Sequence, residues 1–256
     1  MKYKKYKLNP SEKMKGCLKG VLVLVTGVFL LIEGCTKKPA NYYRKIELDG
    51  RYSIVGRYPV PDKIANKVNC YHFIYDEKGK LIKVEYLKSG KLQNDPYFGV
   101  ARIIIEYSEG YEKRIFQDAK GKPKANSDGV YSIRLKLDEN NNPISLFNYD
   151  KEGNLTEDKY GVAQYLWTLD KKGWRIKSIR IDKDGERITD NNGYYELRWK
   201  YDGKGNIIER SNHGKDGQLL EGKDGVAITR MKYDENGNTI EERYFGTDEA
   251  LFNNFV

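Results

Sequence analysis

Apolar and polar residues alternate with a period of two through most of the chain after residue 66, which predicts β-strands. The alternation is itself repeated. A Gly followed by Val or Tyr marks each repeat, at intervals of 30, 32, 32 and 32 residues: Gly99, Gly129, Gly161, Gly193 and Gly225. Counting back by 32 residues places a degenerate first copy at Lys67. The chain is thus predicted to contain six tandem copies, over residues 67–98, 99–128, 129–160, 161–192, 193–224 and 225–256.

Each copy has the pattern of a β-hairpin. The seventh position is apolar in all six copies: Phe73, Ile105, Leu135, Trp167, Trp199 and Met231. Positions 5 and 9 extend this apolar face, and a turn such as Asp202-Gly203-Lys204-Gly205 follows, in which Asp can bond its own backbone and Gly supplies positive φ. A second strand then runs through an Ile in most copies: Ile82, Ile144, Ile176, Ile208 and Ile240. The connecting segment has room for a short third strand.

A single hairpin is only marginally stable in water, so the copies must stack to bury their apolar faces. We therefore predict an all-β fold: an elongated stack of about six 32-residue β-hairpin repeats, forming a continuous antiparallel sheet or a solenoid after a cleaved signal helix. Residues 42–66 precede the first copy, and we expect them to form an N-terminal cap.

The N-terminus has the features of a lipoprotein signal peptide. Lys15 and Lys19 precede the apolar run Val21–Ile32, which is too short to span a bilayer. Ile32-Glu33-Gly34-Cys35 follows and resembles a lipobox, although Glu33 departs from its usual small or apolar residue. The sequence predicts a signal peptide over residues 1–34, with Met14 as the expected true start, a lipid on Cys35 and a linker over 35–41. Thr36 after the Cys favours the outer membrane or cell surface.

Charge and cysteine content narrow the function further. Residues 1–34 carry seven Lys and two Glu, so their removal lowers the net charge from +9 to +4. This modest charge and the lack of a recognition motif argue against nucleic-acid binding. Cys70 is then the only thiol of the body, and no second Cys completes a metal site with it and His72. We expect no metal and no cofactor, and the Asp-rich segments are interpreted as turns, not as calcium loops.

Known catalytic motifs are absent from the sequence. It contains no G-x-S-x-G, H-E-x-x-H, P-loop or G-x-G-x-x-G opening a helix. The chain is therefore expected not to be an enzyme. A pair of carboxylates from distant strands would still suit an envelope enzyme acting on glycan or peptidoglycan. Such a site should break the repeat pattern, and the copy at 99–128 is the irregular one, because it is two residues short.

A set of basic residues, here called the basic ladder, is predicted on the face opposite the apolar one. It comprises Arg134, Lys136, Arg198, Lys200, Arg230 and Lys232. Stacking would align these charges toward a polyanion, so an acidic glycan, an anionic lipid or a protein partner is a candidate ligand. The alternative is a salt-bridged surface, since Glu209 and Glu241 on the partner strand could pair with the ladder across the hairpin.

The motif Y-D-x-x-G-N, found at Tyr201–Asn206 and Tyr233–Asn238, resembles the tandem hairpin repeats of exported bacterial YD/RHS-type and MORN-like proteins. The resemblance covers about residues 67–256 and implies a scaffolding, membrane-associated or binding role. The function expected from the sequence is a membrane-anchored, non-catalytic binding or scaffold module of the cell envelope. The alternatives are the envelope enzyme and an immunity-like protein that binds a toxin.

The lipid anchor gives the first testable prediction. Replacing Cys35 by Ala removes the thiol that would receive the lipid, so Cys35→Ala should leave the membrane fraction and the detergent phase. Fractionation of cells that express either form measures this. A Cys35→Ala variant that stays in the membrane would show that the lipoprotein prediction is wrong.

Overall fold

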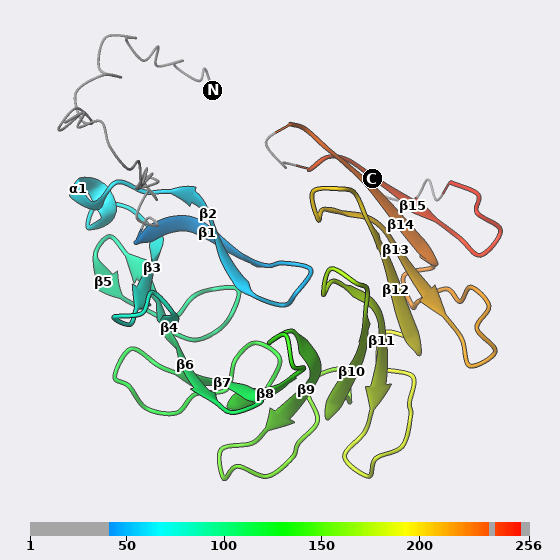
Figure 1. Cartoon of the computed structure of the whole chain (residues 1–256), viewed down its shortest axis with the longest axis horizontal. Coiled ribbons are helices and arrows are strands. Elements are labelled where there is room, and N and C mark those ends of the chain that lie inside the picture. The colour runs from blue at the N-terminus through cyan, green and yellow to red at the C-terminus, as the bar shows by residue number, and fades with distance from the viewer. Residues whose placement is uncertain (1–40, 236–238, 252–256) are drawn as a thin grey trace, which may run out of the picture. The chain divides into compact units, whose positions relative to one another are not determined.

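Fifteen antiparallel strands form one sheet among residues 41–235 and 239–251, which are those that the computed structural model describes (Figure 1). This confirms the predicted all-β fold. The signal peptide (1–34), Cys35 and the linker up to residue 40 lie outside the described residues. Within the described part of the chain, no helix has the length and apolar character needed to cross a membrane.

The N-terminal elements are β1 (Tyr42–Leu48), β2 (Ile54–Pro59) and the short helix α1 (Asp62–Ala65). The remaining strands are β3 (Cys70–Tyr75), β4 (Leu81–Lys88), β5 (Lys91–Leu92), β6 (Arg102–Ser108), β7 (Tyr111–Gln117), β8 (Ser132–Leu137), β9 (Pro143–Tyr149), β10 (Gln164–Leu169), β11 (Arg175–Ile181), β12 (Glu196–Tyr201), β13 (Ile207–His213), β14 (Ile228–Tyr233) and β15 (Thr239–Phe245). From β6 to β15 the strands follow one another along the sheet in chain order, and β4, β3, β1 and β2 continue it at the other end. Each predicted copy contributes one hairpin.

The hairpin turns share one local design, which is visible at Asp76. Its carboxylate accepts hydrogen bonds from the amides of Lys78 at 2.9 Å and Lys80 at 2.8 Å, and Gly79 takes a φ of 79°. The same capping recurs in the later turns, as at Asp202 with Lys204 and Asn206. The Asp residues are thus used to satisfy backbone donors, as the turn interpretation of the sequence requires.

The copy at 99–128 is shorter because its hairpin turn is shorter. β6 and β7 pair without a bulge up to Ser108 and Tyr111, with only Glu109 and Gly110 between them. The hairpins of the other five copies have a register shift before the last residue of their first strand, as between Ile74 and Tyr75. The loss of two residues therefore shortens the turn and leaves the sheet uninterrupted.

The predicted third strand is reduced in most copies to a single bridge after the second strand. These bridges are 32 residues apart: Gln117 with Pro123, Tyr149 with Leu155, Ile181 with Arg187, His213 with Leu219 and Phe245 with Leu251. Only the first described copy makes a short strand here, where β5 pairs with β4. The segments therefore close each unit with a loop and do not widen the sheet.

The N-terminal hairpin does more than cover the first copy. β1 pairs with β3 only at Tyr42 and Tyr43. The turn at the other end of β1 contacts the β10–β11 turn, where Arg51 donates to the Lys172 carbonyl at 2.8 Å and the Arg175 amide donates to the Gly50 carbonyl at 3.1 Å. Because one hairpin touches both places, the intervening sheet must curve around it.

The apolar core lies on the face of the sheet that this curve encloses, which we call the inner face. It contains Phe73, Ile105, Leu135 and Trp167 from the repeats and Ile46 from β1. Alternate residues, including the basic ladder, point to the outer face. The period-two pattern of the sequence thus places the core, because a one-residue shift in register would exchange the two faces.

The stability of the sheet should depend on this inner face. Leu135 is fully buried, so Leu135→Ala should lower the free energy of unfolding by about 2–5 kcal/mol through lost contacts and a residual cavity. Urea unfolding followed by circular dichroism measures the change. Leu155→Ala is the matched control, because Leu155 is 39% exposed and should cost well under half as much. Equal losses in the two variants would contradict this placement of the core.

Candidate binding cleft

A cleft of about 300 Å³ opens between the β1–β2 turn and the inner face of the sheet. Tyr52 and Leu48 line it from the N-terminal hairpin, and Trp167 and Trp199 line it from β10 and β12. Polar groups converge on the same space: Arg114, Asn126, Asp128, Asp158, Arg175 and Arg180. Aromatic walls with a few placed polar groups are typical of small-molecule sites.

Tyr52 is held in the cleft by a strained turn. Asp49 caps this turn as the Asp residues of the repeats do, accepting from the amides of Arg51 at 2.9 Å and Ser53 at 2.8 Å. Tyr52 occupies the position that Gly79 takes in the corresponding repeat turn, and its φ is 62°. A left-handed conformation at a residue other than Gly costs roughly 1 kcal/mol. The ring that this turn presents packs on Trp167, with centroids 4.9 Å apart.

Two arginines of the sheet hold the turn. Arg114 on β7 is 4% exposed, donates to the Tyr52 carbonyl at 2.8 Å and forms an ion pair with Glu112 at 2.6 Å. Arg175 at the start of β11 donates to the carbonyls of Asp49 and Gly50, both at 3.3 Å. The N-terminal hairpin is thus fastened to the sheet by side chains from copies that are far from it in the sequence.

The guanidinium of Arg175 is surrounded by aromatic rings. Its central carbon lies 4.8 Å from the ring centroid of Tyr52, 5.0 Å from that of Trp167 and 5.5 Å from that of Trp199. Within residues 41–235 and 239–251, no carboxylate forms an ion pair with it. Burial therefore lowers the pKa of Arg175, because the charged form loses hydration.

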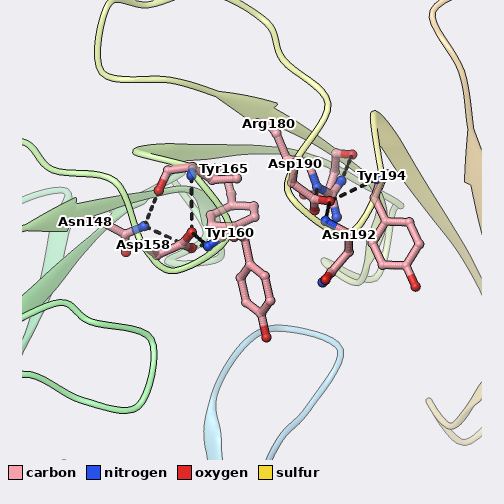
Figure 2. A network of polar contacts seen from close by, with 10 residues as sticks. Asn148, Asp158, Tyr160, Tyr165, Arg180, Asp190, Asn192 and Tyr194 are labelled. Atoms are coloured by element: carbon pink, nitrogen blue, oxygen red, sulfur yellow. Dashed lines mark hydrogen bonds and ion pairs between the residues drawn. The ribbon is translucent and has the colours of Figure 1, made fainter. Parts of the chain in front are cut away.

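A capping network at the polar wall of the cleft recurs one copy later in the sheet (Figure 2). The carboxylate of Asp158 accepts from the Tyr165 hydroxyl at 2.6 Å and from the amides of Tyr160 and Val162 at 2.8 and 3.2 Å. One copy later, Asp190 accepts from the amides of Asn192 and Tyr194, both at 2.9 Å, and from Arg180 at 2.5 Å. Both acids cap a loop between hairpins, as Asn126 does in an earlier copy.

This capping limits what Asp158 can do chemically. Burial raises the pKa of its carboxyl, while the hydrogen bonds from Tyr165 and the two amides oppose that effect. A raised pKa in a cleft is a feature of general acids. The repeated geometry, however, gives Asp158 a structural role shared with Asn126, which has no acid to offer. The arrangement suits ligand binding better than proton transfer.

The basic ladder lies on the outer face, away from the cleft. Arg198 pairs with Glu196 at 2.7 Å, and Lys200 and Arg230 both pair with Glu209, at 2.8 and 2.9 Å. Lys232 pairs with Glu241 at 3.1 Å, so the cross-strand pairing predicted for Glu209 and Glu241 is present. Arg134 instead lies over the ring of Tyr111, and Lys136 is exposed on the same face. Binding of a polyanion by the ladder stays a prediction.

The other residues noted in the sequence have structural surroundings. Cys70 is fully buried beside α1 and lies 3.5 Å from the Ala65 carbonyl. His72 stacks on Tyr42, with ring centroids 4.4 Å apart. Trp174, which follows the β10–β11 turn, is partly buried and packs against Tyr201. Among the described residues, no group of His, Cys, Asp and Glu is placed to hold a metal ion.

Sequence reasoning missed the cleft, although one signal for it was present. The position of Arg175 is uncharged in the other copies, where it holds Leu81, Tyr111, Pro143, Ile207 and Thr239. A charged residue therefore breaks the pattern in the copy at 161–192, not in the irregular copy at 99–128. Tyr52 carried no comparable signal, because it belongs to no repeat.

The described residues define an all-β protein of repeated hairpins in one open sheet. No protein-family model matches the chain, and the search of curated proteins gives no match. Among solved structures, the chain is similar to the crystal structure of TcdB2-TccC3 without its hypervariable C-terminal region, at 13% sequence identity and a TM-score of 0.15. That match covers 84% of this chain but only 14% of the other. A likeness of this size carries no argument about function.

The structural role of Asp158 can be tested through pH. Its raised pKa means that the folded state holds this proton more tightly than the unfolded state, so its ionisation lowers stability as pH rises above about 4, the ordinary pKa of Asp. Asp158→Asn keeps the accepting oxygen, as at Asn126, and removes the ionisation. The stability of the variant relative to the natural protein should therefore increase between about pH 4 and pH 7, as measured by urea unfolding. A difference that is constant over this range would contradict the assignment.

Proposed function

We propose that the protein is an envelope lipoprotein, anchored through a lipid on Cys35, whose repeat sheet is a non-catalytic binding module. The ligand site in this proposal is the cleft between the β1–β2 turn and the inner face. The observation that carries the proposal is the conformation of Tyr52, whose backbone is left-handed and whose ring packs on Trp167. A strained backbone conformation persists only where the surrounding residues hold it in place. Such conformations cluster at ligand clamps and active sites.

The lining of the cleft supports binding. A ligand there would contact Tyr52, Trp167 and Trp199, while the arginines and Asn126 would orient it. The volume, about 300 Å³, is at the lower end of the range of ligand pockets, roughly 300–1,000 Å³, which favours a small ligand. The ion pairs on the outer face make the basic ladder a weaker candidate, because its charges are already largely compensated.

The place of the N-terminal hairpin in the sequence is also consistent with display from a membrane. β1 begins at Tyr42, seven positions after Cys35, so the hairpin that bears Tyr52 is the first described element after the proposed lipid site. The resemblance of the Y-D-x-x-G-N turns to YD/RHS-type repeats fits an exported binding or scaffold role. We propose the outer membrane or the cell surface as the site of display.

The proposal is tested by screening small envelope-type molecules, such as sugars, sugar acids, amino acids and short peptides, against the full chain in detergent. Binding should change the fluorescence of Trp167 and Trp199 and raise the melting temperature. Ser178 lines the cleft, is 2% exposed, and is replaced by Leu146 one copy earlier. Ser178→Leu should therefore fill the cleft and abolish the response.

Two matched controls separate binding from folding. Thr168→Leu makes a similar change on the exposed outer face of β10 and should bind normally. Tyr52→Gly relaxes the turn but removes the ring, so it should lose binding, whereas Tyr58→Gly alters another left-handed Tyr outside the cleft and should keep it. If no compound binds the natural chain, or if Ser178→Leu binds as well as Thr168→Leu does, the cleft is not the ligand site.

A further inference from the structure

Arg175 is a partly buried cation that has no ion-pair partner among the described residues. Its side-chain hydrogen bonds go to carbonyl groups at 3.3 Å, and aromatic rings surround its guanidinium. The acid that acts most strongly on it, Asp49, uses its carboxylate to cap the turn at Arg51 and Ser53. Buried charges are normally paired, because an unpaired one loses its hydration without compensation.

The other cations of the cleft already have ion-pair partners, and its acids are either paired or hydrogen-bonded. Glu47 pairs with Lys45 and Arg57, and Asp128 pairs with Lys159 at 2.9 Å. Asp158 is capped by Tyr165 and two amides, as described above. Arg114 pairs with Glu112, and Arg180 pairs with Asp190. When these pairs are set aside, Arg175 is the cation left to attract a ligand, and the ligand should carry a negative charge.

The walls around Arg175 indicate the rest of the ligand. Tyr52, Trp167 and Trp199 line the cleft with aromatic rings, which suit contact with the C–H groups of a sugar ring. Tyr52 and Asn126 also line it, and the hydroxyl of Tyr52 and the amide nitrogen of Asn126 make no hydrogen bond to another described residue. These groups suit a ligand that carries hydroxyls, and the volume of about 300 Å³ suits one or two rings.

We propose that the cleft binds an anionic sugar, with its carboxylate or phosphate on Arg175 and its ring against Tyr52 and Trp167. This inference rests on the proposed binding function and names its ligand class. The planar guanidinium fork can hold two oxygens of either anion. An acidic polysaccharide or a phosphorylated envelope sugar would supply the same chemistry.

The test compares three sugars that differ only at carbon 6: glucose, glucuronic acid and glucose 6-phosphate. Each is titrated into the full chain in detergent, with tryptophan fluorescence as the readout and inorganic phosphate as the anion without a ring. At least one anionic sugar should bind roughly tenfold or more tightly than glucose, since charge-assisted hydrogen bonds add that much. The anionic sugar that binds more tightly shows whether the site prefers a carboxylate or a phosphate. Inorganic phosphate alone should bind more weakly than either.

Variants assign the preference to Arg175. Arg175→Gln should reduce the preference for the anionic sugar to within about twofold of glucose, and Arg175→Lys should retain part of it. Arg187→Gln is the matched control, because Arg187 lies outside the cleft over the ring of Tyr195. Melting curves confirm that each variant is folded. If Arg175→Gln does not fold, the selectivity of the natural chain and of Arg175→Lys decides.

The outcomes separate this inference from the proposed function. Equal affinity for glucose and both anionic sugars would overturn the inference while leaving a binding cleft. So would a lack of response to all three sugars when another compound of the screen binds and Ser178→Leu abolishes that binding. A preference for the anionic sugar that survives Arg175→Gln would overturn the role of Arg175. If no compound binds at all, the proposed function fails as well.

Discussion

A sheet built from hairpins has one apolar face that no hairpin can cover by itself. Main-chain pairing joins β3 to β15 edge to edge and satisfies the strand backbones, but it leaves the inner face unburied. The chain covers part of this face with its own N-terminal hairpin, which pairs with β3 at one end and reaches the β10–β11 turn at the other. The curvature of the intervening sheet and the cleft both follow from this one contact.

The repeats and the docking contact obey different rules. Within the repeats, polar groups are satisfied locally, because an Asp or Asn at a fixed position caps the next backbone amides, as at Asp158 and Asn126. At the docking contact, a Tyr takes a backbone conformation that Gly takes in most of the repeat turns, and Arg175 is partly buried without an ion-paired acid among the described residues. Strain and an unpaired charge are costs that packing alone does not require. We therefore propose this contact, and not the regular part of the sheet, as the ligand site.

The outer face shows that a regular row of cations can suggest a binding site even when ion pairs already compensate most of its charges. The basic ladder is aligned as the period of the sequence predicts, yet Glu209 lies between Lys200 and Arg230 and pairs with both. Partly exposed pairs of this kind contribute little to stability, so their main effect is to reduce the positive potential of the face. On the inner face, Arg175 has greater consequence because it is partly buried and has no ion-pair partner among the described residues.

The sequence by itself determined the local structure of this protein. The period of two, the 32-residue spacing and the Asp-Gly turns predicted all-β hairpins, their order along the sheet and the inner and outer faces. These features depend on residues that are neighbours in the chain or equivalent positions of adjacent copies. The pairing of Glu209 and Glu241 was also predictable, because hairpin register fixes which side chains oppose each other.

Only the tertiary structure decided where the cleft lies. Tyr52 and Arg175 are separated by more than one hundred residues, and their meeting depends on the summed twist and curvature of seven intervening hairpin strands, β4 and β6 to β11. No local pattern encodes that sum. The break in the repeat at Arg175 marked an unusual residue, but its significance appeared only when the N-terminal hairpin was seen to close over it.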